Sequence, residues 1–175
     1  MNRLRKHAFT MVELVIVLVI MGVMAFAAYK VLMASADKSK TSTLMKSEFA
    51  EIRKNAITIF EMSYRHAFDK ISTQNFHNLF PKSYNMVSNT NANNCIFVSN
   101  VVTGCVWTIK DNTTNNMVSE STYSVNLDCS AVADLAMRKL IESKALGWVT
   151  KEYDIYGTLP EPDGDGNITF TGLVR

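Results

Sequence analysis

A long apolar segment that carries a single acid constrains this chain more than any other feature. The segment spans residues 9–36, its acid is Glu13, and nothing polar occurs from Leu14 to Ala28. About 20 apolar residues form a helix long enough to cross roughly 30 Å of hydrocarbon, and residues 9–29 have that length. A carboxylate costs on the order of 2.5–3.5 kcal/mol at the centre of a membrane, and less near the headgroups. Glu13 therefore needs a specific role.

Cations on the two sides of the segment predict its orientation. Arg3, Arg5 and Lys6 lie within a few residues of its start, and such cations favour a cytoplasmic amino terminus. The lysines beyond it, which weaken this bias, are Lys30, Lys38, Lys40 and Lys46. We expect a single pass with the amino terminus inside and the rest of the chain outside.

An ordinary secretory signal peptide is the first alternative to a membrane anchor. Its apolar core is typically about 7–15 residues long and ends at a small-x-small cleavage site. The apolar run of this chain is longer, although residues 25–27 and 34–36 both fit such a site. Cleavage there would release a soluble exported domain.

A short pattern of residue types surrounds Glu13. A basic leader ends in the small residue Ala8, and Phe-Thr-Met-Val-Glu follows at 9–13 before the apolar run. This pattern resembles the amino terminus of type IV pilins and type II secretion pseudopilins. In that family a dedicated membrane peptidase cuts before the Phe and methylates the new amino group. The resemblance implies a prepilin-type leader of residues 1–8, cleavage between Ala8 and Phe9, and N-methylation of Phe9.

The resemblance covers residues 1–35 and has two departures. Family members nearly always have Gly before the cut, where this chain has Ala8, and many have a helix-breaking Pro where it has Lys30. Without that Pro we expect a continuous helix at this point. Gly22 falls where the family often has a glycine within the helix, so the resemblance places it among the assembly residues.

The resemblance also implies a partner for Glu13. A buried carboxylate is tolerable when it pairs with a cation. In the family's filaments that cation is the amino group of the neighbouring subunit's first residue, and cleavage before Phe9 creates it at the right depth. The plain alternative is a membrane anchor whose acid lies at the interface.

Beyond Ala36 the composition turns polar, but no Pro or Gly occurs before Pro81. Apolar residues recur there at steps of three and four, which predicts an amphipathic helix. A helix over 9–69 would be roughly 90 Å long at 1.5 Å per residue. We expect a transmembrane and assembly part, 9–30, and an amphipathic continuation, 31–70, packed on a globular head. The apolar stripe comprises Leu44, Met45, Phe49, Ile52, Ala56, Ile59, Phe60 and Ser63. The charged residues expected on the other faces are Lys46, Glu48, Glu51, Arg53 and Lys54.

Residues 71–175 predict a small head that shares its core with the long helix. Runs rich in β-branched and aromatic residues predict strands. These runs are 96–98, 106–109, 122–127, 148–156 and 168–170. The expected fold class is α+β, a long amino-terminal helix packed on a small antiparallel sheet, which is the pilin-like arrangement.

One further helix and two loops complete the expected head. The helix should span 131–144, with Asp128 or Ser130 as its N-cap and Gly147 as its stop. Its inward-facing residues would be Leu135, Leu140 and Ile141. The polar segments expected to be loops are 75–94 and 110–121.

The three cysteines are Cys95, Cys105 and Cys129. An exported head could form one disulfide and keep one free thiol. A hairpin centred on Asn100 would place Cys95 opposite Cys105, and Cys105–Cys129 is the rival pairing; both remain open. No Cys-x-x-Cys occurs and no His is near a Cys in sequence, so zinc is not expected.

Asp163, Asp165 and Asn167 place side-chain oxygens at every second residue, as calcium loops do. Some pseudopilins, which the chain resembles, bind calcium in a carboxy-terminal loop. An EF-hand would need Gly in place of Ile168 and an acid where the chain has Val174. Turn chemistry explains the Asp-Gly-Asp-Gly run equally well. We expect no cofactor, with calcium at these three residues as the alternative.

Catalytic patterns are missing from the sequence. No Gly-rich phosphate loop, Gly-x-Ser-x-Gly or His-Glu-x-x-His occurs, and His66 and His77 have no acid or nucleophile partner evident in sequence. The precursor has a net charge of +2, and loss of three leader cations leaves the chain close to neutral. This balance offers no electrostatic case for DNA binding. We expect no enzyme and no clear nucleic-acid binding.

Together these observations predict a subunit of a type IV pilus-like or type II secretion pseudopilus filament. The resemblance implies these partners: other pilin-like subunits, the prepilin peptidase and methyltransferase, an inner-membrane assembly platform and membrane lipid. The protein would lie in the bacterial inner membrane with a periplasmic head before assembly. One alternative is a single-pass, membrane-anchored periplasmic enzyme or sensor that keeps Met1. Another is an exported soluble domain that begins past Ala27 or Ala36.

Overall fold

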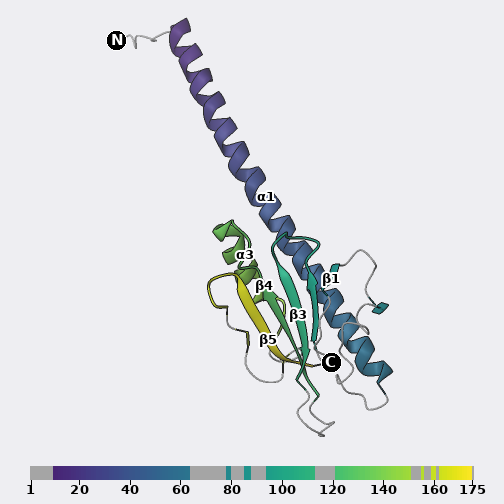
Figure 1. Cartoon of the computed structure of the whole chain (residues 1–175). Coiled ribbons are helices and arrows are strands. Elements are labelled where there is room, and N and C mark those ends of the chain that lie inside the picture. Colours follow the sequence, from purple (N-terminus) through teal and green to yellow (C-terminus); the bar gives the residue numbers. More distant parts are fainter. Residues whose placement is uncertain are drawn as a thin grey trace, which may run out of the picture. The chain divides into compact units, whose positions relative to one another are not determined.

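The computed structural model describes residues 10–63, 78–79, 85–87, 94–112, 121–150, 155, 159–160 and 162–174. The chain divides into two compact units, residues 1–39 and residues 40–175. Its elements (Figure 1) are α1 (Met11–Met62), β1 (Asn85–Val87), β2 (Asn94–Val98), β3 (Val106–Asp111), β4 (Tyr123–Asp128), α3 (Leu135–Ala145) and β5 (Asn167–Leu173).

Helix α1 runs for 52 residues without a break. The continuous helix expected at Lys30, where many pilins have Pro, is therefore confirmed. In the first unit the apolar side chains from Met11 to Met33 are exposed, because no other part of that unit covers them. The expected continuation to Asp69 lies partly outside the described residues.

The second part of α1 buries one stripe of its surface. The predicted spacing of three and four residues is confirmed, because the buried apolar residues of this part are Met45, Phe49, Ile52, Ala56 and Ile59. Leu44 is half exposed and so lies at the edge of the stripe. The ring of Phe49 lies 4.5 Å from that of Phe170 and 5.6 Å from that of Trp148, measured between centroids. Such aromatic contacts add to the energy of burial itself.

The sheet has five antiparallel strands in the order β1-β2-β3-β4-β5, a meander in which each strand pairs with the next in sequence (Figure 1). Burial alternates along β2, β3 and β4, because successive side chains point to opposite faces of a sheet. The buried face carries Cys95, Phe97, Trp107, Ile109, Tyr123, Val125, Leu127, Ile168 and Phe170. The α+β fold class, a long helix with a small antiparallel sheet, is confirmed.

Strand β1 contradicts part of the expected loop 75–94. Asn85 pairs with Val98, and Val87 pairs with Ile96, both on β2. The polar composition of this segment hid the strand, because an edge strand is stabilised by backbone hydrogen bonds to its neighbour rather than by its own propensity.

The expected N-caps of the second helix, Asp128 and Ser130, are wrong, whereas the helix ends just before Gly147 as expected. Asp134 is the N-cap of α3, and its Oδ1 accepts the backbone N–H groups of Ala136 (2.9 Å) and Met137 (3.2 Å). Asp128 instead accepts the N–H of Ser130 (2.9 Å), so it stabilises the turn after β4. Of the predicted inward-facing residues, Ile141 is buried, Leu140 is half-buried and Leu135 is exposed, because α3 begins later than expected.

Two other boundaries differ from the expectation. Lys110 and Asp111 extend β3 into the expected loop 110–121, because they pair with Ser124 and Tyr123 on β4. The expected strand 148–156 is not formed at 148–150, and Ile155 makes only an isolated bridge to Leu173. Residues 151–154 and 156 lie outside the described part.

Candidate functional site

Helix α1 begins with a reciprocal pair of side chains. The Thr10 backbone N–H and Oγ1 donate hydrogen bonds to Glu13 Oε2 (2.8 and 3.0 Å), and the Glu13 N–H donates to Thr10 Oγ1 (3.3 Å). This arrangement is the capping box. It satisfies N–H groups at the helix start, which otherwise have no intrahelical acceptor. Our sequence interpretation missed Thr10, although the Thr-x-x-Glu spacing before an apolar run signals this motif.

The capping box holds the Glu13 carboxylate in place by contacts within the chain itself. Negative groups are favoured at the amino end of a helix because the backbone N–H groups point there. Both Thr10 and Glu13 are exposed in the structure. The carboxylate is therefore positioned by its own helix and remains open to a partner from outside the chain.

Gly22 lies within the exposed part of α1. A Cβ built at this position meets no atom within 4 Å. A glycine inside a helix costs about 1 kcal/mol relative to alanine. No contact among the described residues requires a glycine at this position. The expected role of Gly22 in contacts between subunits stays a prediction. Ala8 and Phe9, the expected processing residues, lie outside the described residues.

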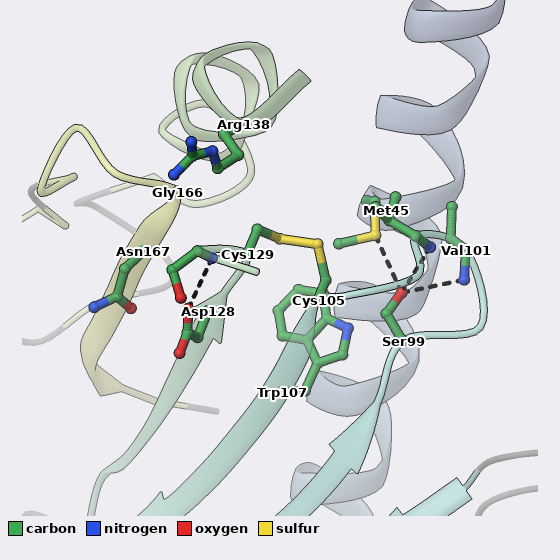
Figure 2. The surroundings of a disulfide bond; sticks show 12 residues. Met45, Ser99, Val101, Cys105, Trp107, Asp128, Cys129, Arg138, Gly166 and Asn167 are labelled. Carbon is green, nitrogen blue, oxygen red and sulfur yellow. Dashed lines mark hydrogen bonds between the residues drawn. A yellow bond between two sulfur atoms is a disulfide. The ribbon is translucent and has the colours of Figure 1, made fainter. Parts of the chain in front are cut away.

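The structure decides between the two possible disulfides. Cys105 and Cys129 are bonded (Figure 2). Cys105 precedes β3 and Cys129 follows β4, and the pairing of Val106 with Asp128 brings them together. Cys95 lies opposite Ile109 instead, so the rival pairing of Cys95 with Cys105 is not made. A cross-link between residues 24 apart typically contributes about 3 kcal/mol by restricting the unfolded chain.

Cys95 is the free thiol among the described cysteines, and it is fully buried. Burial raises the pKa of this thiol to about 12. Since the thiolate is the reactive form, the folded protein should not react with iodoacetamide at about pH 8. Mass spectrometry should show one modified cysteine after unfolding without reductant and three after reduction. Modification of the native protein at the rate of an exposed cysteine would contradict this burial.

One acid of α1 is buried, contrary to the prediction from the sequence. Glu48 was expected on a polar face, but it is 5% exposed. Its Oε2 accepts hydrogen bonds from Ser99 Oγ (2.6 Å) and Trp107 Nε1 (3.0 Å). Its Oε1 accepts the Asn100 N–H (2.8 Å). Glu48 therefore fixes the second part of α1 to β3 and to the turn between β2 and β3.

The expected calcium residues form a turn. Asp163 Oδ1 accepts the N–H groups of Asp165 (2.8 Å) and Asn167 (3.1 Å). The Asp165 N–H, as the largest cause, lowers the pKa of Asp163 below its usual value. Asn167 Oδ1 accepts from Asn126 Nδ2 (2.6 Å). Within the described ranges, no three His, Cys, Asp or Glu side chains come together as metal ligands would.

Comparison with known proteins adds one finding. Residues 3–29 match the family model described as the prokaryotic N-terminal methylation motif. No curated protein and no solved structure matches the chain. The chain therefore carries the prepilin-type amino terminus of type IV pilins and pseudopilins. The match includes Ala8, Phe9, Glu13 and Gly22, so the expected processing site lies within the motif.

The same region has the properties of a membrane anchor. Among the described residues, α1 contains an apolar window that is long enough to cross a membrane, and none of that window is buried. Length and composition alone support this statement. Because the window coincides with the methylation motif, the two observations describe one segment.

Proposed function

We propose that this chain is a structural subunit of a type IV pilus-like or type II secretion pseudopilus filament. The observation that carries the proposal is the coincidence of the methylation motif at residues 3–29 with the exposed apolar part of α1. A helix that is apolar all round must lie in lipid or against other helices. Membrane anchoring supplies the first environment, and a bundle of subunits supplies the second.

The proposed assembly has two steps. A prepilin peptidase removes residues 1–8 and methylates Phe9, while the subunit is held in the bacterial inner membrane by residues 9–30. At an inner-membrane assembly platform the helix then leaves lipid and packs against helices of other pilin-like subunits. The rest of α1, as far as Met62, continues the helix, and the chain beyond it forms the periplasmic head.

Glu13 and Phe9 are the proposed source of register between subunits. Cleavage makes a cationic amine at Phe9, and the carboxylate of Glu13 pairs with that amine on a neighbouring subunit. The capping box supports this role, because it leaves Glu13 exposed at the start of α1. A buried charge without a partner is strongly destabilising. Neighbouring helices would therefore pack stably only in the axial position that pairs the Glu13 carboxylate with the Phe9 amine.

Mass spectrometry of the native amino terminus tests the proposal. We expect the chain to begin at N-methylated Phe9, and to keep its leader in cells that lack the prepilin peptidase. Ala8→Gly, which restores the residue typical of the family, should be cleaved faster and is the matched control. A native chain that starts at Met1 would support the anchored enzyme or sensor. A start past Ala27 or Ala36 would support the exported soluble domain.

A further inference from the structure

A buried carboxylate of α3 holds the loop 163–167. Glu142 Oε1 accepts hydrogen bonds from the backbone N–H groups of Gly164 (3.1 Å) and Gly166 (2.8 Å). Glu142 is only 5% exposed. A buried carboxylate must be compensated by hydrogen bonds or by a cation, and these two amides compensate one of its oxygens.

The two glycines adopt the backbone conformation that this contact requires. Gly164 has φ +87° and Gly166 has φ +99°, a region that glycine enters without steric cost. Turns of this kind direct successive N–H groups into a concavity that attracts anions. The anion in this concavity is the carboxylate of Glu142.

The polar groups of the loop are not oriented as calcium ligands. Calcium takes about 6–8 oxygen ligands, including backbone carbonyls. In this loop the backbone instead directs N–H groups at the carboxylates of Glu142 and Asp163. Arg138 Nη1 donates to the carbonyl oxygen of Asp165 (3.1 Å), so this carbonyl already has a cationic hydrogen-bond donor. Figure 2 shows the Arg138 side chain extending toward Gly166.

We infer that the carboxylate of Glu142 holds this loop in its folded conformation and that the loop needs no calcium. The residues for which the sequence left calcium open do not fit that ion. Asp163 Oδ1 is used by two amides of its own loop. Asn167 Oδ1 is used by Asn126. Of the three candidate ligands, Asp165 alone makes its contacts in the loop through its backbone, and its side chain is exposed.

The contact between Glu142 and the loop also fixes the start of β5. The carbonyl oxygen of Gly166 accepts the N–H of Cys129 (2.7 Å), next to the disulfide. Strand β5 begins at the following residue and carries Ile168 and Phe170 into the core. Loss of Glu142 should therefore lower the stability of the head as a whole.

Thermal unfolding of the full-length protein in detergent micelles tests the inference. With about 1 mM CaCl₂ or with EGTA, we expect Tm values within about 1 °C of each other. Glu142→Ala should lower Tm by roughly 5–10 °C because the buried amide of Gly166 and the less buried amide of Gly164 lose their acceptor. Glu142→Gln, which keeps an acceptor oxygen, should lower it less. Asp165→Ala removes a candidate metal ligand, whose side chain is exposed, without touching the contact, and it should leave Tm unchanged in both buffers.

The opposite results would overturn the inference. A calcium site with a Kd of about 10 µM would raise the Tm of the wild-type protein by roughly 5–10 °C at 1 mM calcium, and Asp165→Ala would reduce or remove that increase. An unchanged Tm in both Glu142 variants would also overturn it. If Glu142→Ala does not fold, the Glu142→Gln variant and the calcium comparison of the wild type and Asp165→Ala still decide the question.

Discussion

Glu13→Ala is expected to be cleaved and to stay in the membrane but to enter filaments at least about 100-fold less than the wild type. The carboxylate is the proposed partner of the Phe9 amine on a neighbouring subunit. Without it that amine would lie unpaired among apolar helices, which typically costs 3–5 kcal/mol. Each 1.4 kcal/mol is a factor of ten in an equilibrium. Immunoblotting of sheared filaments and of membranes measures both fractions.

Two further variants separate the charge of Glu13 from its role as a helix cap. Glu13→Gln keeps an oxygen that can accept from Thr10 but removes the charge, so it should fail as Glu13→Ala does. Thr10→Val removes the Oγ1 contacts of the capping box and keeps the charge. Loss of a cap costs about 1 kcal/mol, so Thr10→Val should assemble with less than about a tenfold loss.

The pattern among the three variants decides which role is correct. Normal incorporation of Glu13→Ala would refute the proposed pairing. Failure of Thr10→Val together with normal assembly of Glu13→Gln would show that helix capping, rather than the charge, is what assembly requires. Unequal cleavage of the variants, measured in the same membranes, would place the effect on processing instead.

Glu48→Ala should destabilise the head by about 3 kcal/mol or more. The carboxylate accepts from Ser99 Oγ, the Asn100 N–H and Trp107 Nε1, and two of these contacts are buried. A buried donor that loses its acceptor costs about 1–3 kcal/mol. For a chain of this size 1 kcal/mol shifts Tm by roughly 2–4 °C, so thermal unfolding should show a fall of about 6–12 °C.

Matched variants on the same helix control this prediction. Lys46→Ala removes an exposed charged side chain, and such surface changes are usually within about 0.5 kcal/mol. Glu48→Gln keeps one acceptor oxygen, so its loss should be smaller than that of Glu48→Ala. Equal stability of Glu48→Ala and Lys46→Ala would contradict the role of Glu48 in fixing α1 to the sheet.

Patterns that depend on residues near one another in sequence predicted much of this protein. The apolar run, the stripe of Met45, Phe49 and Ile52, and the alternation in β3 and β4 all follow from helix and strand periods. The motif around Glu13 is also local, and it was sufficient to predict the prepilin-type amino terminus. The missed capping box at Thr10 was within reach of the same reasoning.

Other features required the tertiary structure. The disulfide joins Cys105 to Cys129 and not to Cys95, because the register of β3 against β4 decides which sulfur atoms meet. β1 exists because β2 offers an unpaired edge. Glu48 is buried because donors more than 50 residues away converge on it.

The sequence by itself therefore determined the long helix, its apolar half, the runs that form β2, β3, β4 and β5, and the processing motif, since each depends on short-range periodicity or on a contiguous pattern. The tertiary structure alone decided the disulfide, the edge strand and the burial of Glu48 and Glu142. These depend on strand register and on contacts between distant segments, which no local pattern encodes.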